Sequence, residues 1–198
     1  MTLLNRLMMC TILLVSPCVF GQDLETPDIY GLGDQTFSIS AGVILPLFIH
    51  RVDGTITPGF NQLSLGATGS LRWGTFLTNE LTLGIDVGGM FAFSTLGRTL
   101  VMLPISGIIT YAIRFYPFEL LLHGGIGVCI TKLDNDVYVG PSLMPGLSFY
   151  WNYSAEWSFG LKTEYWWIPE MYFGDAPPSS HTSFGNFIGI TLSTLYHF

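Results

Sequence analysis

Along most of the chain, apolar residues alternate with small or polar ones at a period of two. In residues 184–198 the apolar phase holds Ile188, Ile190, Leu192, Tyr196 and Phe198, together with Thr194. The other phase is mostly small or polar. Side chains of a β-strand point alternately to its two faces, so this period predicts strands with a different environment on each face.

The same alternation predicts eight strands in all. We expect them at residues 36–49, 62–75, 80–94, 101–116, 119–131, 138–151, 156–168 and 184–198. Short turns near Phe76, Pro117 and Asn152 alternate with longer loops near Asp53, Gly97, Asp134 and Pro177. An even number of antiparallel strands whose connections alternate in length is typical of bacterial barrels, which have brief periplasmic turns and longer external loops.

The charged residues of the expected strands indicate which face of the sheet is turned toward lipid and which toward the lumen. All of them share the Gly/Ser/Thr face: Arg72, Glu80, Asp86, Arg114, Glu119, His123, Glu156, Lys162 and Glu164. A soluble lipocalin-like barrel would have its polar face outside. Here the apolar face has to meet an apolar surrounding, and lipid fits, because a charge on that face at mid-bilayer would cost about 2–4 kcal/mol. A large soluble β-sandwich with both faces covered is the alternative.

Composition favours the membrane interpretation. The chain is 49% hydrophobic and 11% charged, whereas a soluble domain has roughly 25% charged residues. After residue 21 we find no apolar run of about 18 residues that would span a bilayer as a helix. Since lipid cannot satisfy open backbone groups, a closed barrel is what remains. We therefore expect an all-β fold, an eight-stranded antiparallel transmembrane up-and-down β-barrel over residues 36–198.

The N-terminal residues differ from the rest. Residues 1–21 read as a signal peptide, with Arg6, an apolar stretch at 7–15, and Val19 and Gly21 placed for cleavage before Gln22. A lipoprotein cysteine at Cys18 is the alternative. Residues 22–35 form an acidic lead-in segment. Without Arg6 the chain has 6 Lys and Arg against 14 Asp and Glu, a net charge of −8, which excludes a nucleic-acid footprint.

The residues of the lumen-facing phase change in character along the barrel axis. We expect a polar plug in the lumen, with Arg72, Glu80, Asp86, Arg114, His123, Lys162 and Glu164. Toward the external end the same face becomes apolar, and the residues there are Ile44, Pro46, Phe48, Met90, Met102, Pro104, Met144, Trp166 and Phe187. Methionine suits an adaptable binding wall, so one hypothesis is an apolar pocket open to the outside. The other is ordinary filling, because side chains nearly fill an eight-stranded barrel.

Together with the number of strands, three features carry a resemblance to a known family. They are Leu103-Pro104 within a strand, the run Gly124-Gly125-Ile126-Gly127, and the ending Tyr196-His197-Phe198. In these the chain resembles small eight-stranded bacterial outer-membrane proteins of the OmpW/OprG type. The resemblance implies a bacterial outer-membrane location, contact with its lipid, and binding or passage of small hydrophobic molecules. Tyr196 and Phe198 resemble a C-terminal sorting signal, which implies the barrel-assembly machinery as a partner.

Two other function classes are open to such a barrel. A non-transporting structural or adhesin-type surface barrel, like the OmpA transmembrane domain, would have long loops, and only residues 50–61 and 169–183 qualify. An enzyme is not expected, since the His50–Asp53 and His181–Asp175 pairs fit solvated loops better than catalysis. No cofactor or metal is expected either, because residues 134–136 are too short for a calcium loop.

Overall fold

The computed structural model describes residues 30–51, 54–59, 63–94, 97–133, 136–169 and 183–198. The expected signal peptide and most of the lead-in segment lie outside these residues. Nearly all of the described chain is strand, as the alternation predicts. Among the described residues, no helix is long and apolar enough to cross a membrane.

In the described part of the chain, eight long strands form the barrel, and a ninth, short one joins it. The long strands are β1 (Gln35–Arg51), β3 (Gly66–Phe76), β4 (Leu81–Phe93), β5 (Thr99–Phe115), β6 (Phe118–Leu133), β7 (Asp136–Asn152), β8 (Trp157–Pro169) and β9 (Ser183–His197). The short strand β2 (Ile56–Pro58) lies within the first long connection and pairs only with β1. Each bound of the eight long strands lies within four residues of the predicted one.

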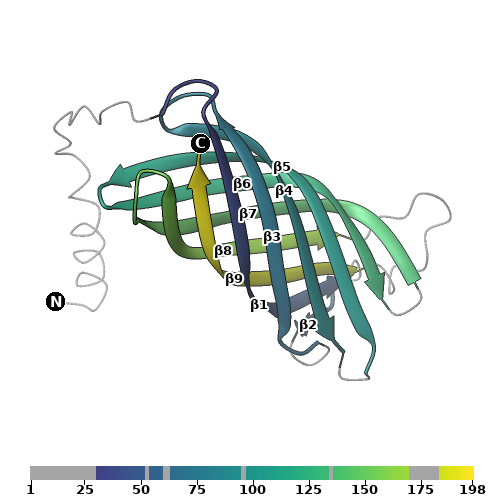
Figure 1. Cartoon of the computed structure of the whole chain (residues 1–198). Helices are drawn as coiled ribbons and strands as arrows, with labels where there is room; N and C mark the ends of the chain where they lie inside the picture. Colours follow the sequence, from purple (N-terminus) through teal and green to yellow (C-terminus); the bar gives the residue numbers. More distant parts are fainter. Residues whose placement is uncertain (1–29, 52–53, 60–62, 95–96, 134–135, 170–182) are drawn as a thin grey trace, which may run out of the picture.

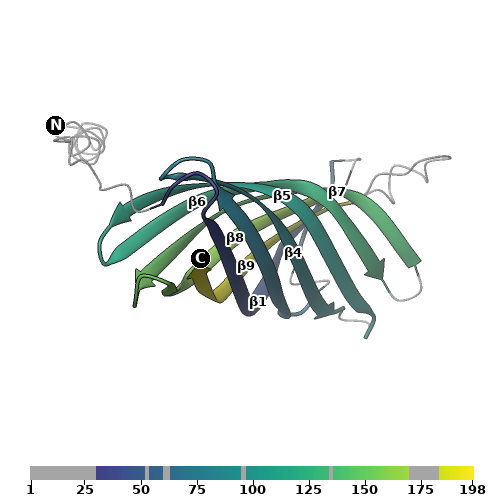
Figure 2. The same cartoon turned by 45° about the horizontal axis from the view of Figure 1, so that its top comes forward.

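The sheet closes on itself, because β1 pairs with β9 as well as with β3 (Figure 1). All pairings are antiparallel, and the strands run obliquely around the barrel (Figure 2). At the seam, Gln35 and Phe198 exchange two backbone hydrogen bonds of 2.8 and 3.0 Å. Closure satisfies both sheet edges, which a structure in lipid requires. The fold is therefore the predicted eight-stranded up-and-down barrel.

The two ends of the barrel differ in their connections. We call the end with residues 77–80, 116–117 and 153–156 the turn end, and the opposite end the loop end. Gln35 and Phe198 lie at the turn end, where Gly33 donates a backbone hydrogen bond to Phe76. Every connection at the turn end has four residues or fewer, as the sequence predicts.

The outer face is apolar all round. Leucine, isoleucine, valine and aromatic side chains of the predicted outward phase are exposed, among them Leu71, Ile85, Ile109 and Leu161. Their lumen-phase neighbours are buried, as in β5, where buried and exposed residues alternate from Met102 to Ile113. An apolar outside with a filled inside is the reverse of a soluble barrel.

Three predicted positions next to strand starts are wrong. The alternation predicts that Glu80 and Glu156 face the lumen, but both lie exposed in turns, one residue before β4 and β8 begin. The alternation within the strand predicted at residues 62–75 puts Leu63 in the apolar, outward phase, which is also wrong. In the structure, that strand begins only at Gly66. The Leu63 side chain points inward, and 6% of the residue is exposed.

Candidate functional site

The loop half of the lumen holds one apolar cluster, which we call the methionine cluster. Met90, Met102 and Met144 are each 3% exposed or less, and they come from β4, β5 and β7. The other members are Ile44, Leu63, Ala92, Leu100, Cys129, Trp166, Ile168 and Phe187. Six of the nine residues expected to line an apolar pocket belong to this cluster. Pro46 and Pro104 are also buried in the lumen.

Phe48 departs from that expectation. The register between β1 and β9 shifts between Pro46 and Phe48, and Phe48 is 37% exposed, outside the cluster. A bulge adds one residue to one strand and so reverses the side-chain phase beyond it. Leu63, from the connection after β1, enters the cluster instead. Beside it, Gly59 lies against Pro46, where a Cβ would approach the Pro46 backbone to 2.7 Å.

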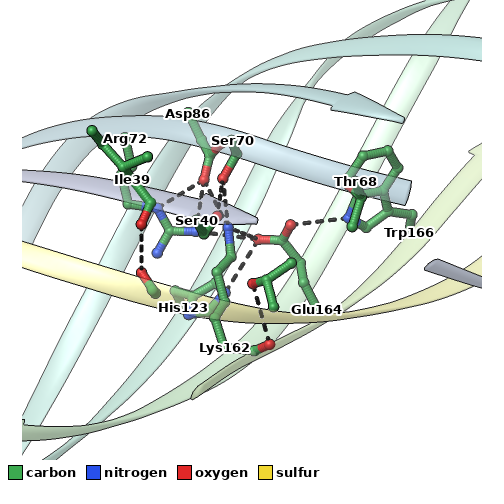
Figure 3. Close-up of polar contacts among 12 residues, drawn as sticks. Ile39, Ser40, Thr68, Ser70, Arg72, Asp86, His123, Lys162, Glu164 and Trp166 are labelled. Atoms are coloured by element: carbon green, nitrogen blue, oxygen red, sulfur yellow. Dashed lines mark hydrogen bonds and ion pairs between the residues drawn. The ribbon is translucent and has the colours of Figure 1, made fainter. Parts of the chain in front are cut away.

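The middle of the lumen is filled by a buried charge network (Figure 3). Arg72 bonds Asp86 through Nε at 2.8 Å and Nη2 at 2.7 Å, and reaches Glu164 Oε1 at 3.2 Å. Lys162 Nζ lies 3.1 Å from Asp86 Oδ2 and 3.2 Å from Glu164 Oε1. Two cations thus meet two carboxylates, each held by more than one partner. This is the pairing that buried charges require.

Two further residues attach to Glu164. His123 Nε2 lies 3.2 Å from Glu164 Oε1, and its side chain is fully buried. On the other side, the Trp166 indole nitrogen donates a 2.9 Å hydrogen bond to Glu164 Oε2. Trp166 also belongs to the methionine cluster, so Glu164 joins the charge network to the apolar half of the lumen (Figure 3).

The turn half contains a second ion pair and a cavity. Arg114 Nε lies 3.1 Å from Glu119 Oε1, and both side chains are buried. Below the charge network, a cavity of about 30 Å³ is lined by Arg72, Glu119, Tyr150 and His197 among others. That volume fits about two water molecules. Of the predicted plug residues, the structure joins Arg72, Asp86, His123, Lys162 and Glu164, while Arg114 pairs separately.

An aromatic cap closes the turn end, which the alternation could not predict. Tyr30 stacks on Phe76 at 4.5 Å and on His197 at 4.6 Å between ring centroids. The Arg114 guanidinium lies 4.9 Å from the Tyr30 ring centre and also donates to the Asn79 backbone oxygen. Burial, with a smaller contribution from Glu119, raises the pKa of Tyr30 to about 12. Tyr30 precedes the first strand, so no periodic signal marks it.

The described part of the chain offers no cluster of three or more His, Cys, Asp or Glu side chains suited to a metal ion. Cys129 is a free, fully buried thiol within the methionine cluster. The lumen thus has an apolar half toward the loop end and a half with paired charges toward the turn end.

Comparison with known proteins agrees with this architecture. Neisserial surface protein A (NspA) superimposes with a TM-score of 0.59 at 11% identity, covering 85% of this chain and 100% of that one. The outer-membrane protein OprG from Pseudomonas aeruginosa gives 0.53 at 13% identity, covering 85% and 97%. At such identities these likenesses establish the fold. A search among curated protein sequences finds no match.

A protein-family model matches residues 21–196, most of the chain. Its range includes seven of the eight long strands in full and all of β9 except its last residue, His197. In its fold, the chain resembles the small eight-stranded outer-membrane β-barrel proteins.

Proposed function

We propose that this barrel binds small hydrophobic molecules in the loop half of its lumen. The observation that carries the proposal is the methionine cluster. Three methionines from different strands meet there, and the unbranched, polarizable side chain of methionine repacks around varied shapes more easily than that of leucine or isoleucine.

The site lies beneath one end of the barrel only. Leu63 covers the cluster from the first long connection, while the charge network lies below it. A hydrophobic molecule would enter past Leu63 and stop at the charges. A water-filled pore is not part of the proposal, because side chains fill the cross-section of the lumen at both levels.

The proposal places the barrel in the bacterial outer membrane with its loop end outside. The neighbouring structures are bacterial outer-membrane proteins, and in such barrels the longer loops face outward. Residues 1–21 would act as a cleaved signal peptide, and the C-terminal strand would be recognised by the assembly machinery. Contact with outer-membrane lipid follows from the apolar outer face.

The test uses one tryptophan as reporter. Trp73, Trp151, Trp157 and Trp167 are exposed on the outer face and are replaced by phenylalanine, which leaves Trp166 as the only indole. Bromo-octane, an apolar quencher, is titrated into the refolded barrel held in amphipol. Saturable quenching of Trp166 emission is expected.

Two substitutions on the same strand sharpen the result. Met144→Ala removes buried volume from the cluster and should tighten bromo-octane binding, because apolar cavities of this kind take up apolar ligands. Leu147→Ala removes similar volume on the lipid face, where Leu147 is 48% exposed, and should leave binding unchanged. Quenching that never saturates, in a barrel shown to be folded by its gel shift on boiling, would refute the proposal.

The second candidate is a structural or adhesin-type barrel without a ligand. Close packing favours it, since nine of the eleven cluster members are at most 5% exposed. Under this alternative the methionines only fill the lumen, and the parent protein gives no saturable quenching.

A further inference from the structure

The boundary between the methionine cluster and the charge network contains a second, smaller cavity. Its volume is about 10 Å³, enough for one water-sized group. The polar groups that line it are Ser40, Thr68, Ser70, Lys162, Glu164 and Thr191. Trp166 forms part of its wall and also belongs to the methionine cluster. One indole therefore separates a polar cavity from an apolar site.

We propose that the molecules bound by this barrel are amphipathic, with an apolar tail and one uncharged polar end the size of a hydroxyl group. This deepens the proposed function and rests on it. The tail would lie among the methionines. The polar end would pass the Trp166 indole and enter the small cavity.

The cavity offers partners for such a group. Lys162 Nζ donates to Ser70 Oγ over 3.1 Å, and Ser70 in turn lies 2.9 Å from Ser40 Oγ. Glu164 Oε2 accepts from the Trp166 indole nitrogen. A hydroxyl group that takes the place of the indole can donate to the same carboxylate, so the hydrogen bond lost when Trp166 moves is replaced.

Charge balance limits the polar end to an uncharged group. Arg72 and Lys162 already compensate Asp86 and Glu164, and both carboxylates are buried. A carboxylate or ammonium entering the cavity would remain without a counter-charge in a buried site, which is costly. Alcohols and phenols of moderate size meet the requirement, whereas alkanes leave the cavity unused.

Gly189 provides a specific way to close the cavity. It lines the cavity from β9, and a Cβ there would meet the Glu164 backbone oxygen and Thr68 Cγ2 at 3.8 Å, ordinary contact distances. Gly189→Ala should therefore fold normally and occupy the space. Gly124→Ala is the matched control, since no atom lies within 4 Å of a Cβ built at Gly124.

The experiment compares three bromo-octyl quenchers on the single-tryptophan barrel: bromo-octanol, bromo-octane and bromo-octanoate. Bromo-octanol should bind tightest. Gly189→Ala should weaken its binding about threefold to tenfold, the range for one hydrogen bond, and leave bromo-octane unchanged. Gly124→Ala should change neither. If Gly189→Ala does not fold, Ser40→Ala removes a hydroxyl of a residue that lines the cavity and should have the same selective effect.

The outcomes separate this inference from the proposed function. Equal affinities for bromo-octanol and bromo-octane, or an equal loss of both in Gly189→Ala, would overturn the amphipathic ligand and keep an apolar site. Tightest binding of bromo-octanoate would also overturn it, because the polar end would then be charged. No saturable binding of any of the three would refute the proposed function together with the inference.

Discussion

Arg72 and Asp86 lie directly opposite each other on β3 and β4, and two guanidinium nitrogens of Arg72 bond the same carboxylate oxygen, Asp86 Oδ2. Lys162 reaches that oxygen from β8, on the far side of the lumen. Asp86 therefore links strands that are not neighbours in the sheet. A contact across the lumen braces the barrel in a way that the backbone ladder does not.

Removal of Asp86 should consequently cost much of the stability of the barrel. In Asp86→Ala, Arg72 keeps only Glu164, and three groups compete for one carboxylate. We expect a loss of about 3–5 kcal/mol in the free energy of unfolding, the usual cost of breaking a buried pair. Urea unfolding in lipid vesicles, followed by tryptophan emission, measures it. A change within error would show that the network contributes little, and Glu156→Ala, which removes an exposed carboxylate at the turn end, is the control.

Gly146 makes room for His123. A Cβ at Gly146 would lie 2.5 Å from His123 Nε2 and 2.6 Å from the Thr163 backbone oxygen. Because the second neighbour is backbone, Gly146→Ala should force a shift in β7 or β8 and lower the unfolding midpoint. Gly124→Ala, on the strand paired with it, should leave the midpoint unchanged. Equal midpoints for the two variants would contradict the close approach.

The aromatic cap should respond to alkaline pH. The pKa of Tyr30 is raised to about 12 from an ordinary 10.0, so the folded state favours the neutral phenol. The stabilisation is complete below pH 10 and is lost as the pH rises toward 12. The difference in tyrosinate absorbance between the parent protein and Tyr30→Phe should give the Tyr30 step near pH 12. A step near pH 10 would mean that Tyr30 is not buried in the cap.

Planar bilayers should show no stable ion conductance for this barrel. The charge network, the Arg114–Glu119 pair and the aromatic cap all occupy the lumen in series. Single-channel recording of the refolded protein should give no steady open level. Tyr30→Ala removes only the cap and should remain silent, because the network still closes the lumen. Long-lived conductance steps in the parent protein would refute a closed lumen.

The Phe198 side chain should matter for assembly and not for the final barrel. Its backbone bonds Gln35 at the seam, whereas its ring is 57% exposed and stacks on Tyr196. Phe198→Ala keeps the backbone bonds, so refolding into detergent should be normal. If the assembly machinery recognises this ring, the amount of folded barrel in cells, measured by its gel shift on boiling, should fall in Phe198→Ala. Phe198→Tyr should behave like the parent protein, and normal cellular levels of Phe198→Ala would contradict the sorting role.

Periodicity predicted the barrel well because each strand separates two solvents. The sequence alone predicts that Asp86, Lys162 and Glu164 face the lumen, because a charged side chain on the lipid face would cost too much free energy. Which of these charges pair could not be read, because the contacts join β3, β4, β6 and β8 across the lumen. Such contacts depend on the stagger of the barrel, which alternation does not encode.

The errors lie where the alternation stops. Glu80 and Glu156 follow the lumen phase but precede their strands by one residue, so they reach water at the turn end. Phe48 follows a register shift, and Leu63 precedes β3 and folds inward. Tyr30 lies before the first strand, in an acidic segment with no periodic pattern. Each case depends on where a strand begins or where its register shifts. Hydrophobic alternation does not define these positions, because it marks the faces of a strand and not its ends.

The charge network also determines how the barrel responds to an electric field. A field across a membrane acts on net charge, at about 2.3 kcal/mol per elementary charge for each 100 mV. Arg72 and Lys162 offset Asp86 and Glu164, so with His123 uncharged the network has no net charge for the field to move. A membrane potential therefore exerts no net force that would displace the whole network. Opening of the lumen would have to be driven by a molecule that replaces one of its contacts.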